Sequence, residues 1–214
     1  MENLNIHKEI NFDLEEQILT KAKDLFMSVG IRNTTMDDIA KDLGISKKTL
    51  YKAIENKSDL VTKCILHDLI LRKKEVDTIV SKYPNPIEQM LQLGAHILYA
   101  FKQHKLSIIH DLMKFYPESW YLVMEHKENY VKEIIKNNLK NGIRSGVYRK
   151  DIQVDIYANF FMSGTDISIN SNIFPESAFD FSDIFREFLF YHLRGIVNEN
   201  AIHELDKLIE KIKF

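Results

Sequence analysis

Apolar residues recur every three or four positions along most of the chain, a spacing that predicts helices throughout. The first clear stripe ends at Gly30, which suits a left-handed helix terminus, so a first helix is expected over about residues 14–29. Its apolar positions share one helical face: Ile18, Ala22, Leu25, Phe26 and Val29. Only seven glycines and four prolines interrupt such patterns, and no segment is convincing as a strand.

Two short helices are predicted next. In residues 34–38, TTMDD, each threonine precedes an aspartate by three positions, which is the pattern of a capping box and opens a helix over about 36–43. Gly44 then allows a tight turn, and Ser46 can cap a third helix from 47 to about 54. Three helices within some forty residues make a compact headpiece.

The rest of the chain continues as helices. A long pattern runs from 59 to about 81 and stops at residues 83–86, YPNP, which we interpret as a hinge between two functional halves. Further helices are expected at 87–103, 106–116, 118–145, 154–170, 182–195 and 201–214. The sequence therefore predicts an all-α fold: an N-terminal helix-turn-helix domain at 1–57, with the motif at about 35–54, and a C-terminal helical bundle at 58–214.

The third predicted helix has two distinct faces. At about 100° per residue, one arc of about 140° holds Lys47, Lys48, Tyr51, Lys52 and Glu55. The opposite side holds Leu50, Ala53 and Ile54. Because the whole chain has a net charge of −2, this local basic face favours a confined DNA contact over nonspecific coating of nucleic acid. A helix of this kind suits the major groove, and a merely solvated lysine face is the alternative.

The string from residue 18 to 61, ILTKAKDLFMSVGIRNTTMDDIAKDLGISKKTLYKAIENKSDLV, closely resembles the DNA-binding domain of the tetracycline-repressor (TetR) family. The matching features, in order, are Ala22, Leu25-Phe26, Gly30, Thr34-Thr35, Ile39-Ala40, Gly44-Ile45-Ser46, Thr49-Leu50-Tyr51, Lys57 and Leu60. The resemblance implies a three-helix headpiece whose third helix enters the major groove, with the first long helix of a sensor domain packed against it. Beyond this string, the resemblance is one of architecture only.

The resemblance, carried over by position, and the exposed arc of the third helix together predict a set of DNA contacts: Thr35, Ser46, Lys47, Lys48, Thr49, Tyr51, Lys52 and Lys57. Thr35, Tyr51 and Lys57 would contact phosphates. For Ser46 and Thr49, helix capping alone is an equal alternative. One departure matters, since many relatives carry an aromatic residue or histidine where this chain has Ala53, which cannot reach the DNA backbone.

Aromatic and methionine residues crowd the middle of the chain, and a plain hydrophobic core explains most of them. A sensor pocket is expected to be largely apolar with a few polar groups. Our candidates for its lining are His96, Tyr99, His110, Trp120, Asp166 and Asn170. The eight histidines include no pair spaced by four residues and no His-Glu-x-x-His pattern, so neither a metal site nor a cofactor is predicted.

The sequence gives little support for a secreted protein, a membrane protein or an enzyme. The lone Cys64 rules out an intramolecular disulfide and fits a reducing cytoplasm, and the N-terminus lacks the pattern of a signal peptide. No apolar run approaches the roughly 18 to 20 residues that a membrane span needs. Without a phosphate-binding loop or a nucleophile elbow, the sequence does not predict an enzyme.

The leading hypothesis is a cytoplasmic one-component transcription regulator. By resemblance it is a repressor that binds a palindromic double-stranded DNA operator as a homodimer and is released by a small, mostly apolar organic effector. The dimer is expected to form through residues 154–170 and 182–195, whose apolar faces exceed what one small domain covers. Two alternatives stay open: a DNA-binding or adaptor module without a small effector, and a helical enzyme or carrier with a vestigial headpiece.

Overall fold

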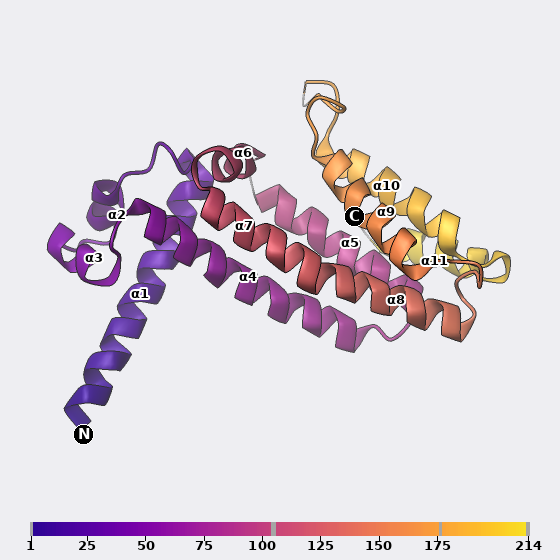
Figure 1. Ribbon diagram of the computed structural model, residues 1–214, viewed down its shortest axis with the longest axis horizontal. Helices are drawn as coiled ribbons and strands as arrows, with labels where there is room; N and C mark the ends of the chain where they lie inside the picture. Colours follow the sequence, from indigo (N-terminus) through magenta and orange to yellow (C-terminus); the bar gives the residue numbers. More distant parts are fainter. Residues whose placement is uncertain (1, 104–105, 176, 213–214) are drawn as a thin grey trace. The chain divides into compact units, whose positions relative to one another are not determined.

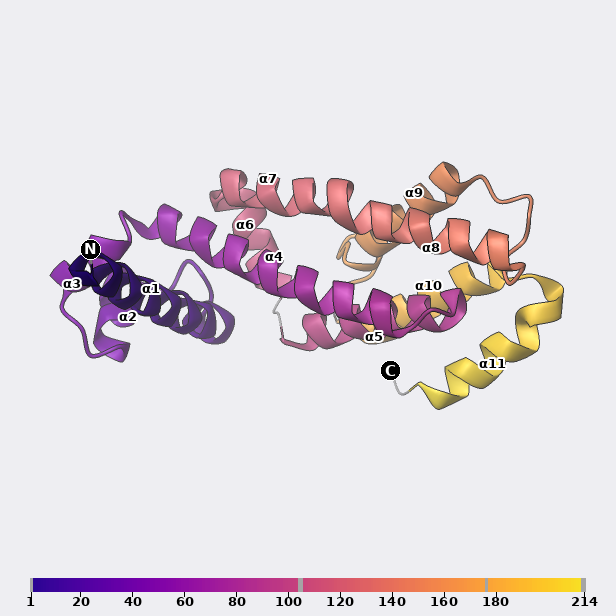
Figure 2. The same ribbon diagram turned by 90° about the horizontal axis from the view of Figure 1, so that it is seen from below.

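The computed structural model describes residues 2–103, 106–175 and 177–212. Within them the regular structure is helical, and the only β pairing is an isolated bridge between Tyr148 and Val197 (Figures 1 and 2). The predicted all-α fold is confirmed. The chain forms two compact units, residues 1–72 with 103–124 and residues 73–102 with 125–214. The predicted functional boundary after residue 57 is a different kind of division and stays a prediction.

The first unit holds the headpiece. Its helices are α1 (Glu2–Val29), α2 (Met36–Asp42), α3 (Lys47–Ala53), the start of α4 (Lys57–Lys82), α6 (Leu106–Phe115) and most of α7 (Pro117–His126). Helices α1, α2 and α3 pack against one another (Figure 1). Their shared core includes Ile18, Phe26, Ile39, Leu50 and Ile54. Burial of these side chains, each worth about 1.5–3 kcal/mol, fixes how α3 is presented.

Local capping sets the ends of the short helices. Thr35 is the N-cap of α2: its hydroxyl oxygen accepts from the Asp38 amide, and the Asp38 carboxylate accepts from the Thr35 amide. Thr34 instead lies buried, and its hydroxyl donates to the Gly30 carbonyl. Gly30 and Gly44 adopt φ values of 95° and 66°, a left-handed conformation in which a side chain would be strained. The predicted turns are thus confirmed.

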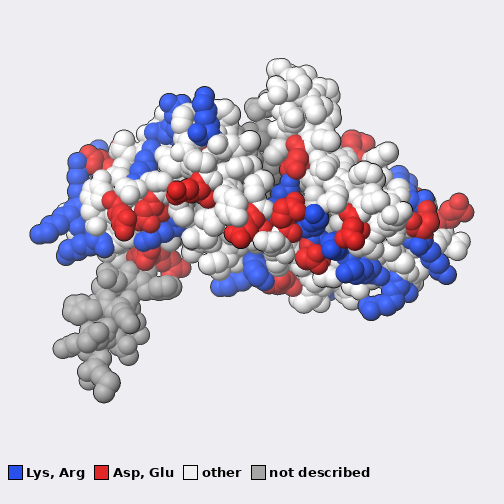
Figure 3. Space-filling model, in the orientation of Figure 1, with Lys and Arg blue, Asp and Glu red and all other residues white. Residues whose placement is uncertain are grey.

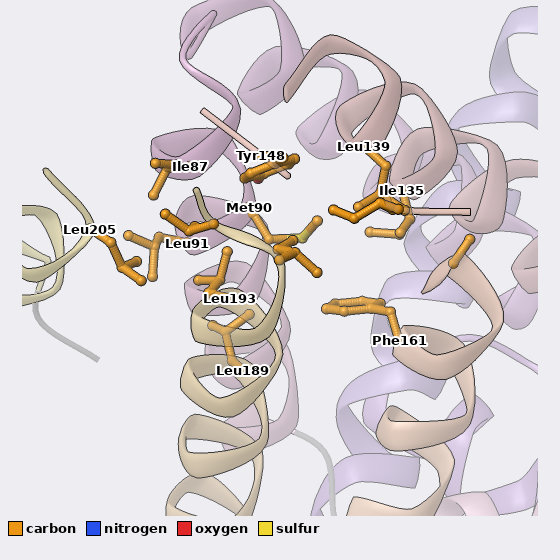
Figure 4. Close-up of a cluster of buried hydrophobic side chains, with 14 of the residues drawn as sticks. Ile87, Met90, Leu91, Ile135, Leu139, Tyr148, Phe161, Leu189, Leu193 and Leu205 are labelled. Carbon is orange, nitrogen blue, oxygen red and sulfur yellow. The ribbon is translucent and has the colours of Figure 1, made fainter. Parts of the chain in front are cut away.

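The second unit contains the rest of α4, α5 (Pro86–Gln103), α8 (Lys132–Ser145), α9 (Val154–Ser168), α10 (Phe181–Ile196) and α11 (Ile202–Lys211). Helix α9 packs against both α8 and α10. Figure 4 shows apolar side chains converging from these helices, among them Met90, Leu139, Phe161, Leu189 and Leu205. They form one continuous core.

The helix predicted over 118–145 is not a single α-helix. Residues Lys127–Val131 form a π-helical turn between α7 and α8. Within this turn the Tyr130 hydroxyl donates to the Asp77 carboxylate (2.6 Å), and the Lys73 ammonium lies 4.4 Å from the Tyr130 ring centroid. The prediction of an uninterrupted helix was wrong because an apolar stripe does not distinguish an α turn from one π turn.

Polar side chains, of which Gln89 and Asn138 are buried, hold the backbone at the break between α4 and α5. Asn85 caps α5, its side-chain oxygen accepting from two backbone amides, while the Gln89 amide donates to the Val80 and Tyr83 carbonyls. The side chain of Asn138 on α8 joins the same cluster. The proline break is therefore tied to α8 by side chains, and its role as a hinge stays a prediction.

Candidate nucleic-acid interface

Helix α3 separates its polar and apolar faces as the sequence predicts. Lys47, Lys48, Tyr51, Lys52 and Glu55 are all exposed. Leu50 and Ile54 are fully buried in the core of the first unit, and Ala53 is half-buried. Figure 3 shows the resulting gathering of basic side chains over α3. Because the buried residues anchor the helix, its basic face is held outward on a fixed support.

Two of the three small hydroxyl residues in the predicted DNA-contact set, Ser46 and Thr35, cap helices, whereas Thr49 lies within α3. The Ser46 hydroxyl accepts from the Thr49 amide (3.1 Å) and lies 2.8 Å from the Thr49 hydroxyl. The exposed Thr35 hydroxyl donates to the Asp38 carboxylate (2.6 Å), which lowers the pKa of that carboxyl. Capping is therefore observed for Ser46 and Thr35, and their contact with DNA stays a prediction.

The lysines of α3 differ in what they contact. The Lys47 ammonium lies 2.6 Å from the Asp37 carboxylate at the start of α2, and this partner raises the pKa of Lys47. Within the described part of the chain, Lys48 and Lys52 form no ion pair. These two lysines are thus free to bind an external anion, whereas Lys47 is already paired with Asp37 of the same chain.

Lys57 is placed differently from the rest of the set. It is half-buried at the start of α4, and its ammonium donates to the Arg32 carbonyl at 3.1 Å. Burial lowers its pKa. Arg32 itself is exposed, with its guanidinium 4.4 Å from the Phe115 ring centroid. Sequence reasoning missed both Asp37 and Arg32, because neither lies on the predicted third helix.

Comparison with known proteins identifies the headpiece. Residues 18–64, which include α2, α3 and the start of α4, match the family model of bacterial regulatory proteins of the tetR family. Over these residues the chain is similar to the TetR family, and they hold the helix-turn-helix segment described above.

Relatives support this assignment. An HTH-type transcriptional regulator of Staphylococcus aureus is 31% identical over 106 residues, which cover 47% of this chain and 57% of the relative. The chain thus matches little more than half the length of that relative. A TetR transcription regulator from Haloarcula marismortui aligns with a TM-score of 0.75 at 15% identity, over 87% of this chain and 99% of that one. A Saccharomonospora viridis protein assigned as a transcriptional regulator was solved in complex with choline. It aligns with a TM-score of 0.73 at 17% identity, over 87% of this chain and 99% of that one. At such identities these structures establish the fold alone.

The predicted effector residues are divided between the two units. In the first unit, His110 is exposed, and Trp120 packs half-buried against the headpiece core. In the second unit, His96 is half-buried on α5 with its ring 3.6 Å from the Glu75 carboxylate. Tyr99 is 64% exposed.

The remaining two effector candidates are both exposed. Asp166 on α9 pairs with Lys127, and the Asn170 side chain accepts a hydrogen bond from the backbone amide of residue 172 at 3.0 Å. Both groups thus serve contacts within their own unit. Lining of an effector pocket stays a prediction for all six residues.

The described residues also bear on reactive-thiol, metal-binding and membrane-spanning chemistry. Cys64 is buried, and burial raises the pKa of its thiol to about 12, so it stays protonated and unreactive at neutral pH. Over residues 2–103, 106–175 and 177–212, no three histidine, cysteine or acidic side chains are grouped so as to hold a metal ion. Among the helices described, none has both the length and the apolarity to cross a membrane.

Proposed function

We propose that the protein regulates transcription by binding a palindromic DNA operator through α3. The observation that carries the proposal is the exposed basic face of α3 within the segment that matches the tetR family model. A capped helix that follows a tight glycine turn can enter the major groove, where its N-terminal residues meet base edges and its lysines meet phosphates. Tyr51, Lys48 and Lys52 are the best-placed contacts because they are exposed side by side on that face. No catalytic activity is assigned.

A homodimer would supply the second half-site. Helices α9 and α10 leave large apolar side chains uncovered, including Phe160 on α9 (61% exposed) and Tyr191 on α10 (81% exposed). Ile156 and Ile167 on α9 are exposed as well. Not every apolar residue of the expected range 154–170 is available, since Phe161 is buried in the chain's own core. The two α3 helices of such a dimer are expected to read half-sites about one helical turn, roughly 34–36 Å, apart on DNA.

Release by a small organic effector is the second part of the proposal. Its support is the S. viridis structure, which has the same fold and was solved with choline. An effector can act only by binding the DNA-free arrangement more tightly, and a coupling of about 1–3 kcal/mol would change operator affinity by about 5- to 150-fold. We expect a mostly apolar molecule and repression in its absence, as the resemblance implies.

The test is selection of duplexes from a random DNA library by the purified chain. We expect one palindrome to be enriched and its affinity to fall steeply with salt. Replacing Lys48 and Lys52 together with alanine should abolish enrichment. The matched control replaces two other exposed lysines, Lys74 and Lys150, and should leave it unchanged. Absence of any enriched duplex, or equal loss in the control, would refute DNA recognition by α3.

Effector response is tested separately on the enriched duplex. Small organic compounds that raise the melting temperature of the protein are added to the complex, and the affinity for DNA is measured with each. A compound that stabilises the protein and weakens DNA binding supports the sensor function. If every stabilising compound leaves DNA affinity unchanged, the protein is a DNA-binding module without a small effector.

A further inference from the structure

Asp37 is an acidic residue placed against the basic face of α3. It lies in the first turn of α2, and its carboxylate is 2.6 Å from the ammonium of Lys47, the first residue of α3. Both side chains are more than half exposed, at 58% for Asp37 and 62% for Lys47. The neighbouring Asp38 is used differently, since its carboxylate closes the capping box with Thr35. Of these two acids, only Asp37 binds a lysine of the basic face.

We propose that Asp37 is a specificity-determining residue of the DNA interface. It holds Lys47 in the free protein, and Lys47 leaves it only for DNA that presents a well-placed acceptor. This inference rests on the proposed function, because it concerns the same face of α3.

The physical reason lies in the difference between loose and close-fitting complexes. Nonspecific binding comes almost entirely from lysines and arginines that neutralise phosphates and release counterions. The Lys47–Asp37 pair is neutral as a unit, so it adds nothing to that attraction. In a close-fitting complex the Lys47 ammonium can instead meet a fixed acceptor, such as O6 and N7 of a guanine, which competes with the carboxylate. Asp37 therefore weakens nonspecific binding more than it weakens specific binding.

Removing the carboxylate charge makes the effect measurable. In Asp37→Asn, Lys47 becomes a mobile cation that any phosphate attracts, which adds about one neutralised phosphate to the nonspecific complex. The slope of log affinity against log salt should then steepen by about 0.9 on random-sequence DNA. Between about 50 and 200 mM salt, this amounts to about a 3.5-fold larger loss of affinity than the wild type shows.

The experiment compares Asp37→Asn with Asp42→Asn. Asp42 lies at the other end of α2 and pairs with Lys21 at 2.9 Å, so the control removes the same charge and also frees one lysine. Affinities are measured for a random-sequence duplex and for the duplex that the wild-type chain enriches from a random library. We expect Asp37→Asn to raise affinity for random DNA at low salt and to lower the ratio of specific to nonspecific affinity. Asp42→Asn should change neither quantity.

A double variant tests whether Asp37 acts through Lys47. In a Lys47→Gln background, Asp37→Asn should no longer change the salt slope or the specificity ratio. If it still does, Asp37 acts by direct repulsion of phosphates and the pair mechanism is wrong. If Asp37→Asn behaves like Asp42→Asn while the enriched duplex is still bound, this inference alone fails. If the wild-type chain enriches no duplex, the proposed function fails as well.

Discussion

Replacing Asn138 with alanine should destabilise the second unit far more than its position on a polar helix suggests. Asn138 is 1% exposed, and its amide nitrogen donates to the Pro86 carbonyl and to the Gln89 side-chain oxygen, both at 2.9 Å. Its own oxygen accepts from the Tyr148 hydroxyl at 3.0 Å. The substitution removes all three bonds at once.

The magnitude follows from these contacts. Each hydrogen bond contributes about 1 kcal/mol net, and leaving the buried Gln89 oxygen without the bond that it accepts adds to the cost. We therefore expect a loss of about 3–4 kcal/mol in the free energy of unfolding. The one hydrogen of the Tyr148 hydroxyl is shared between the Asn138 oxygen and the Pro86 carbonyl, so after the substitution the hydroxyl can still donate to Pro86 at 2.9 Å.

Urea unfolding followed by circular dichroism measures this loss. The control is Asn141→Ala on the same helix, where the side chain is exposed and bonds only the nearby Arg144, so the change should stay within about 0.5 kcal/mol. For a chain of this length, about 3 kcal/mol corresponds to a fall of roughly 6–12 °C in melting temperature. Equal effects of the two substitutions would refute the assignment of a buried, fully used amide at Asn138.

Three further outcomes are expected. Ser46→Ala should cost about 1 kcal/mol of stability, measured by urea unfolding, because it removes the N-cap of α3. Burial lowers the pKa of His192 to about 4, from about 6.5 in the unfolded chain. The unfolded chain therefore binds a proton first as pH falls, so the protein should lose stability between about pH 6.5 and 4. Unfolding curves at several pH values should show a loss of about 3 kcal/mol that His192→Leu abolishes. Phe160→Asp should yield a monomer by light scattering, whereas Tyr121→Asp, equally exposed in the first unit, should not; a dimer in both variants would exclude the α9 face.

Local features of the fold could be predicted from the sequence because their causes act over a few residues. The capping box of α2 joins residues three apart, and the left-handed glycine after α1 ends the helix where the apolar stripe stops. Helix α2 accordingly spans Met36–Asp42, close to the expected 36–43. The exposed face of α3 follows from the same local periodicity, combined with burial of Leu50 and Ile54.

Close packing of a side chain against a helix could not be predicted in this way. A Cβ on Gly142 would lie 1.9 Å from the Tyr148 ring, so only glycine fits there. In the sequence, this glycine looks like any other residue of a helical pattern. The choice between Thr34 and Thr35 as the cap of α2 was likewise open, since both precede an aspartate by three positions and only burial of Thr34 separates them.

The sequence by itself determined that α3 carries a basic face and which residues compose it. The tertiary structure alone decided which of the predicted lysines already have partners within the chain. Lys47 is paired with Asp37 across the turn between two helices, and Lys57 is tied to the Arg32 carbonyl, 25 residues away along the chain. Ion pairs and hydrogen bonds act over a few ångströms in space, whereas helical periodicity records only neighbours along one helix. The set of lysines was therefore predictable, and their partners became known only once the chain was folded.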